Sequence, residues 1–264
     1  MKMNRATLND IDVAYTVEGS GDPVVFVHGL AEDRHTWSGQ QQALGGRYRG
    51  YACDLRGHGL TSLGQADGTL AQLGHDLLAF LERVTGPARV VGFSLGGTIA
   101  LWAAAERPDL VRKSVVLGTS SVVGRAAVQF YQDRIAQAAD TGSAAFRDAL
   151  RADTEAGLHR QHASLGRIVD ARLAAVGDGR GYVNAARAMM GLNAEPLTPR
   201  LARIETPVVV IGAEHDRFCP QKAATILLDA LPGAAFLTIP EAGHLMNVDN
   251  PDAVTQALRQ ALAG

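Results

Sequence analysis

Residues 88–97 read ARVVGFSLGG, and this stretch sets a serine between a short apolar run and the helix-forming segment TIALWAAAER at 98–107. The apolar run is typical of a buried strand. Gly92 and Gly96 stand two residues before and two residues after Ser94. A sharp turn from strand to helix needs small residues at such positions and strained backbone angles at its centre. Although Gly-x-Ser-x-Gly also occurs as a plain glycine turn, its place here predicts that Ser94 is presented at the carboxyl end of a strand.

The rest of the chain alternates strand-like and helix-like segments. We expect an antiparallel hairpin over 5–17, strands at 23–29, 48–55, 88–94, 113–119, 206–216 and 234–244, and helices at 35–46, 69–84, 95–106, 220–231 and from 251. Such an order favours right-handed crossovers between parallel strands. The sequence therefore predicts an α/β protein with a mostly parallel sheet of about eight strands flanked by helices.

The alternation breaks between residues 121 and 200, where helix-forming residues rich in Ala, Arg and Asp contain no convincing strand. We interpret this segment as an inserted helical cap. The core would then consist of residues 1–120 and 201–264, and the cap of residues 121–200. An insertion at this point would cover the carboxyl edge of the sheet, where ligands of open α/β sheets bind.

Composition narrows the classes of function. The 264 residues are 47% hydrophobic and 20% charged, with a formal net charge of −2, so no basic footprint for nucleic acid or an anionic membrane exists. No apolar run approaches the length of a membrane helix, and the amino-terminal residues lack the apolar core of a secretory signal. We expect a cytoplasmic protein that binds a small molecule, with free thiols at Cys53 and Cys219. A homo-oligomer is compatible with the sequence.

Serine alone is a weak nucleophile, so a general base and an orienting carboxylate must lie nearby. His244 follows the expected strand that begins at residue 234, and a side chain just past a strand end can reach the sheet edge where Ser94 lies. An isolated loop histidine is more often inert, but this position favours a catalytic role. Glu214 and Asp216 both end the preceding strand. We favour Asp216 as the acid and keep Glu214 as the alternative.

The order Ser, Asp, His along the chain resembles that of α/β-hydrolase-fold enzymes, and the similarity covers essentially the whole sequence. Further matching segments are HGL at 28–30, DLRGHGLTS at 54–62, and the spacing of Gly212 and Asp216 with Pro220 after them. One departure is NVDNP at 247–251, where many relatives carry a glutamate before the proline, and we expect it to be structural.

The resemblance implies an oxyanion hole formed by the backbone N–H groups of Leu30 and Leu95. A plain strand-ending turn is the alternative interpretation of the HGL segment. For His28, and for Asp54, Arg56, His58 and Ser62 in the 54–62 segment, we expect structural roles rather than chemistry.

The resemblance also implies hydrolysis of a carboxylic ester or lactone of a small, largely apolar substrate through an acyl-enzyme on Ser94. Thioesterases, perhydrolases and C–C bond hydrolases share the same triad, and some proteins of this fold act as ligand receptors that retain it. A serine at position 94 argues against haloalkane dehalogenases and epoxide hydrolases, which use a carboxylate nucleophile. Met189 and Met190 are candidates for the lining of an apolar pocket beneath the cap.

Two other possible sites are not favoured by the sequence. The glycines lack the dinucleotide-binding spacing after the first parallel strand. His159 and His162 are close enough to suggest a metal pair, but no third ligand is evident, and we expect solvated helix positions. We therefore expect no metal and no cofactor.

Overall fold

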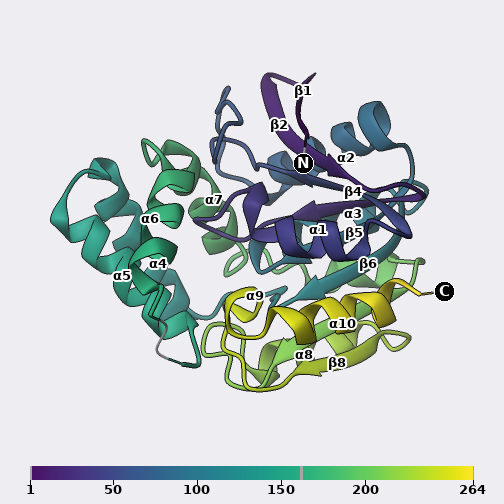
Figure 1. Cartoon of the computed structure of the whole chain (residues 1–264). Helices are drawn as coiled ribbons and strands as arrows, with labels where there is room; N and C mark the ends of the chain where they lie inside the picture. Colours follow the sequence, from purple (N-terminus) through teal and green to yellow (C-terminus); the bar gives the residue numbers. More distant parts are fainter. Residues whose placement is uncertain (1, 161–162, 264) are drawn as a thin grey trace.

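The computed structural model describes residues 2–160 and 163–263, and its strands form one eight-stranded sheet in the order β1-β2-β4-β3-β5-β6-β7-β8 (Figure 1). The strands are β1 (Lys2–Leu8), β2 (Ile11–Glu18), β3 (Asp22–Val27), β4 (Tyr48–Cys53), β5 (Ala88–Phe93), β6 (Val111–Leu117), β7 (Val208–Ala213) and β8 (Ala235–Ile239). β2 pairs antiparallel with β1 and β4, and all other pairs are parallel. The predicted sheet, antiparallel at its start and parallel afterwards, is confirmed.

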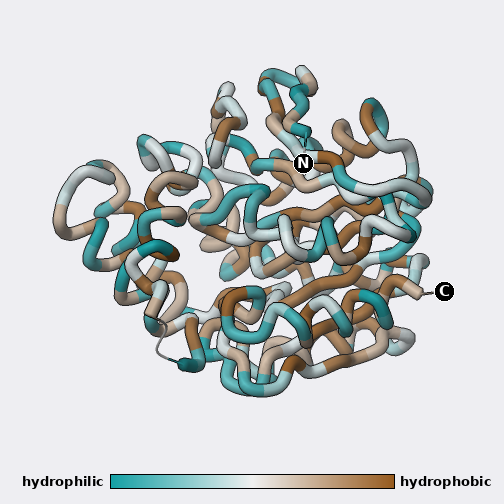
Figure 2. Tube along the Cα trace, in the orientation of Figure 1, coloured by the Kyte–Doolittle hydropathy of each residue, from teal (hydrophilic) through white to brown (hydrophobic). Residues whose placement is uncertain are grey.

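Helices cover both faces of the sheet. They are α1 (Ser38–Leu44), α2 (Leu70–Phe80), α3 (Leu95–Glu106), α8 (Gln221–Ala230), α9 (Met246–Asp249) and α10 (Pro251–Leu262). In β3, Val25 and Val27 face the cluster that contains α2, α3 and α8, whereas Val24 and Phe26 face the cluster that contains α1 and α10. A strand covered on both faces reads as a continuous apolar run, and brown accordingly runs through the interior of the molecule in Figure 2.

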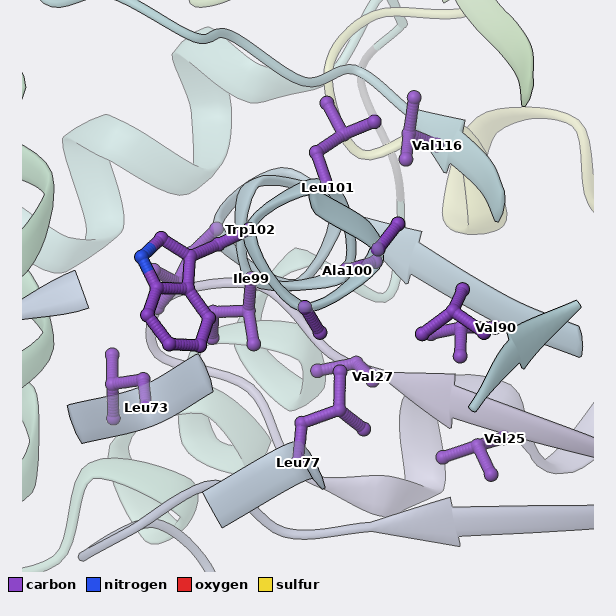
Figure 3. Packing of buried hydrophobic residues seen from close by; sticks show 14 of the residues in the cluster. Val25, Val27, Leu73, Leu77, Val90, Ile99, Ala100, Leu101, Trp102 and Val116 are labelled. Atoms are coloured by element: carbon purple, nitrogen blue, oxygen red, sulfur yellow. The ribbon is translucent and has the colours of Figure 1, made fainter. Parts of the chain in front are cut away.

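Helix α3 follows Ser94 directly, and its residues from Leu95 to Ala105 are all buried. Trp102 and Ile99 on α3 pack above Leu73 and Leu77 of α2, as Figure 3 shows. The indole ring lies so close to α2 that a Cβ at Gly74 would be 1.9 Å from Trp102 Cε3. This close packing holds α3 against α2.

A helical insertion separates β6 from β7 and forms a lobe beside the sheet (Figure 1). It contains α4 (Arg125–Gln137), α5 (Ala144–Gly157), α6 (Leu165–Val176) and α7 (Arg180–Gly191), with no strand among its described residues. Phe146 and Tyr182 form its own small core with an edge-to-face ring contact at 5.5 Å. Ser121 ties the two ends together, because its carbonyl accepts the Leu197 N–H at 2.8 Å and its hydroxyl meets that of Thr198 at 2.7 Å.

Some expected boundaries differ from the structure. The helix expected over 35–46 begins as a 3-10 turn at Arg34–Trp37 and continues as α1. The strand expected over 234–244 ends at Ile239, because Pro240 has no N–H to donate to the ladder and Glu241 turns with a φ of 49°. No described helix combines the length and apolar character that crossing a membrane requires.

Candidate active site

Ser94 occupies the turn between β5 and α3 in a strained backbone conformation, with a φ of 51° and a ψ of −117°. The turn closes only with glycine at its flanks. A Cβ on Gly92 would lie 2.3 Å from the Gly96 carbonyl oxygen, and a Cβ on Gly96 would lie 2.3 Å from the Val27 carbonyl oxygen. The Ser94 N–H donates to the carbonyl of Leu117 at 2.8 Å, which anchors the turn to β6. Strain of this kind is typical of functional positions.

His244 links Ser94 to Asp216. Its Nε2 lies 3.0 Å from Ser94 Oγ, and its Nδ1 lies 2.8 Å from Asp216 Oδ2. The three side chains follow β5, β7 and β8, whose carboxyl ends meet at one edge of the sheet. The structure thus brings together the three residues singled out from the sequence, in an arrangement that can transfer a proton from the serine hydroxyl to the imidazole.

Asp216 lies in an environment that favours its ionised form. Burial raises the pKa of this carboxyl, but the charge and hydrogen bond of His244 lower it, as do the N–H groups of Cys219 and Phe218 at 2.8 and 2.9 Å, and the pKa lies below its ordinary value. Glu214, the alternative acid, is half exposed and accepts the Glu241 N–H, with no contact to His244.

The two backbone N–H groups expected to form the oxyanion hole belong to Leu30 and Leu95. Leu95 is the first residue of α3, so its N–H has no partner within the helix. Leu30 lines the same cavity as Ser94. Both N–H groups lack an acceptor in the described part of the chain.

Hydrogen bonds to two buried side chains, His28 and Glu32, hold the loop that carries Leu30. His28 Nε2 accepts the Leu55 N–H at 2.9 Å, and burial lowers the pKa of His28 to about 4, so the imidazole is neutral at pH 7. Glu32 accepts the Gly29 N–H at 3.0 Å, and burial raises the pKa of this carboxyl. Sequence reasoning missed Glu32, although an acidic residue two positions after HGL was a visible signal.

The 54–62 segment is braced by its own polar side chains. Asp54 accepts the N–H groups of Arg34 and Leu60 at 2.7 and 2.8 Å. His58 packs against the ring of His28 at 5.4 Å, and Ser62 Oγ accepts the Asp12 N–H at 2.7 Å. None of these residues lines the cavity that contains Ser94.

A cavity of about 680 Å³ lies between the insertion and the sheet edge, with Ser94 and His244 in its wall. Its lining is mainly apolar and comes chiefly from α4 and α8 together with the loops that precede these two helices. Met189 is buried and lines this cavity, whereas Met190 does not, so the expectation for Met190 is corrected. Both residues are on α7, but adjacent helix positions point about 100° apart, and only one faces the cavity. A second cavity of about 390 Å³ adjoins it and shares Leu245 and Arg172 in its wall.

The histidine considered as a metal ligand lies outside both cavities. His159 stacks on His215 at 3.8 Å, and His162 lies outside the described residues. Within the described part of the chain, no group of three or more His, Cys, Asp or Glu side chains could hold a metal ion. Cys53 and Cys219 are both free thiols, and Cys219 lines the larger cavity.

Comparisons with known proteins identify the fold family. The model of the alpha/beta hydrolase fold matches residues 22–251. The chain is 33% identical over 266 residues to BpoC of Mycobacterium tuberculosis, provisionally named a non-heme bromoperoxidase, with 96% of this chain and 98% of BpoC covered. It is 25% identical to 3-oxoadipate enol-lactonase 2 of Acinetobacter baylyi, over 97% of this chain and 95% of that enzyme. A hydrolase from Pseudomonas aeruginosa superposes with a TM-score of 0.87 at 25% identity, covering 99% of this chain and 98% of that structure. The chain therefore belongs to the α/β-hydrolase fold family.

Proposed function

We propose that this protein is a serine hydrolase that cleaves a carboxylic ester or lactone of a small, largely apolar substrate through an acyl-enzyme on Ser94. The observation that carries the proposal is the continuous hydrogen-bonded chain from Asp216 through His244 to the Ser94 hydroxyl, which lies in the wall of a mainly apolar cavity. The similarity to an enol-lactonase supports an ester-type bond as the target.

In the proposed reaction, His244 Nε2 takes the proton of the Ser94 hydroxyl while Oγ attacks the substrate carbonyl carbon. The negative charge that develops on the carbonyl oxygen is stabilised by the N–H groups of Leu30 and Leu95. The C–O bond to the leaving alcohol breaks as His244 returns the proton to that oxygen. Water, deprotonated by His244, then attacks the acyl-enzyme, and Ser94 recovers its proton as the carboxylic acid leaves.

We also propose that residues 121–200 act as a cap that selects the substrate, over a core of residues 1–120 and 201–264. The support for this division is that α4 and α7 contribute cavity-lining side chains such as Phe130 and Met189, whereas the three reacting side chains all follow core strands.

Mass spectrometry with a panel of esters, lactones and thioesters tests the proposal. We expect many turnovers per chain on an activated short-chain ester, and an acyl adduct on the peptide that contains Ser94. The Ser94→Ala variant should fold normally and lose nearly all hydrolysis, because alanine fits the turn but supplies no nucleophile.

Three outcomes would contradict it. Retention of more than about a tenth of kcat by Ser94→Ala would place the chemistry elsewhere, since loss of a nucleophile typically costs several orders of magnitude. An adduct on Ser120, the other serine in the cavity wall, would do the same. Release of no more than one product per chain would indicate a receptor instead of an enzyme.

A further inference from the structure

Arg172 is a cationic side chain in the wall between the two cavities. It lies on α6 of the insertion and lines both the cavity that contains Ser94 and the smaller cavity beside it. Its side chain is only 14% exposed. A long charged side chain held this far from solvent normally has a partner, because an unpaired buried charge is costly.

The guanidinium of Arg172 has only a loose ion pair and no hydrogen bond to its partner. Its nearest charged group is Glu32, whose Oε1 lies 4.0 Å from Nη1, beyond hydrogen-bond distance. The Nε atom is buried and has no acceptor, and the side chain donates no hydrogen bond among the described residues. The other oxygen of Glu32 accepts the Gly29 N–H. The Nε–Nη2 edge, which can hold a carboxylate by two parallel N–H···O bonds, therefore has no carboxylate on it among the described residues.

Another arginine of the insertion shows what a satisfied guanidinium looks like in this fold. Arg134 on α4 holds Asp153 through Nε and Nη2 at 2.6 and 2.7 Å, with a side-chain exposure of 16%. The two arginines have similar burial, but only Arg134 has a carboxylate on its Nε–Nη2 edge. What Arg172 lacks is a planar anion of the same kind.

The charge of the larger cavity also favours an anion. Arg217 and Lys222 contribute to its wall from exposed positions near α8. Asp153 is the acidic residue in that wall, and Arg134 already engages it. On the side of the smaller cavity, both polar atoms of the Asn247 amide are buried without a partner, so polar ligand atoms suit that side better than hydrocarbon.

We propose that the substrate carries a carboxylate, and that the guanidinium of Arg172 binds it while the ester or lactone carbonyl lies at Ser94. The inference rests on the proposed hydrolase function and adds a substrate class to it. The substrate would be a small ester or lactone whose apolar body fills the larger cavity and whose acidic group faces α6.

Two esters that differ in one group test the assignment. They are 4-nitrophenyl hexanoate and the mono-4-nitrophenyl ester of adipic acid, in which a carboxylate replaces the terminal methyl group. In Arg172→Met, we expect kcat/KM for the adipate ester to fall about 10-fold or more, mainly through KM, because a charge-assisted bidentate contact is lost. The value for the hexanoate ester should stay within about twofold. Arg172→Lys should lose less, because it keeps the charge but not the planar fork.

Arg112→Met is the matched control. Arg112 is an exposed residue at the amino end of β6, far from the carboxyl edge that carries Ser94, and it lines neither cavity. This variant makes the same change in net charge, and the ratio of kcat/KM between the two esters should match wild type. A shifted ratio in Arg112→Met would mean that overall charge, and not the contact at Arg172, sets the preference, and would overturn the inference.

The outcomes separate this inference from the function on which it rests. Equal loss on both esters in Arg172→Met, with an unchanged melting temperature, would overturn the carboxylate site while the hydrolase proposal survives. Failure of wild type to turn over either ester would count against the hydrolase proposal. Calorimetry on Ser94→Ala then decides the site without turnover: monomethyl adipate should bind about 10-fold tighter than methyl hexanoate, and the added Arg172→Met change should abolish that difference. Equal binding of the two esters would overturn the site.

Discussion

Replacing Arg56 with methionine should destabilise the fold without disturbing the chemistry at Ser94. The Arg56 side chain is 2% exposed. Its Nε and Nη2 donate to Asp76 at 2.7 and 2.8 Å, its Nη2 also pairs with Asp10 at 2.7 Å, and its Nη1 donates to the carbonyl of Leu63 at 2.9 Å. One side chain therefore joins the amino-terminal hairpin, the loop that begins at residue 54, and α2.

The expected cost follows from burial. Removing one partner of a buried ion pair typically costs about 3–5 kcal/mol, because the remaining charge is left without compensation. In Arg56→Met, Asp76 would keep only the amide of Asn9, which donates to it at 2.8 Å. We expect the free energy of unfolding in urea, followed by circular dichroism, to fall by about 3–4 kcal/mol, and the melting temperature by about 6–12 °C.

Arg107→Met supplies a control with nearly the same contacts and a different exposure. Arg107 also holds one carboxylate with Nε and Nη2, that of Asp109 at 2.8 and 2.7 Å, and pairs with Glu82 at 2.6 Å, but its side chain is 41% exposed. A surface pair contributes about 0–1 kcal/mol. Equal losses in the two arginine variants, or a loss under about 1 kcal/mol in Arg56→Met, would refute the argument from burial.

The remaining predictions concern the site and its pH dependence. Asp216→Asn should reduce kcat severely, because His244 loses the charge that orients it, whereas Glu214→Gln should have only a mild effect. If steady-state rates showed a larger loss in Glu214→Gln, Glu214 would be the acid. Met189→Ala should change the ratio of kcat/KM between small and bulky acyl groups by about 10-fold. Met190 does not line the cavity, so Met190→Ala should leave this ratio unchanged. A small serine-directed phosphonate should label both variants about equally. Burial lowers the pKa of His58 to about 4, so the unfolded chain takes up this proton first as the pH falls, and unfolding free energy should drop by up to about 3 kcal/mol between pH 6.5 and 4. His58→Asn should reduce that drop in urea titrations at several pH values without abolishing it, because burial also lowers the pKa of His28 to about 4. An unchanged slope would show that other groups cause the drop.

Local spacing explains why the sequence predicted so much of the site. Glycine at both flanks of Ser94 has one main structural use, and the structure shows the close backbone contacts that require it. The order of strands fixes which loops reach the carboxyl edge, so His244 and Asp216 could be selected from their positions after β8 and β7. These inferences need only short-range patterns and the handedness of crossovers.

The cavity wall could not be predicted in the same way. Arg172 and Met189 come from helices whose orientation depends on tertiary packing, and helical periodicity alone does not say which face looks toward Ser94. Glu32 follows a segment that was noticed, but its burial results from the insertion packing over it, with α6 bringing Arg172 to within 4.0 Å. Met190 is an example, since the neighbouring Met189 lines the cavity and Met190 does not, and the sequence alone did not distinguish the two.

Hydrogen bonds join Ser121 to Leu197 and Thr198, so the two ends of the insertion lie side by side. The chain leaves the sheet and returns to it at one point, so a lobe of different length or shape can replace this one without pulling on its flanking strands. Register between β6 and β7 is set separately, through pairs such as Ser114 with Val208. The insertion can therefore change in sequence without disturbing the pairing of the strands. We expect that replacing it with a different helical segment between Ser121 and Leu197 would alter which substrates enter the cavity, while Ser94, Asp216 and His244 keep their positions.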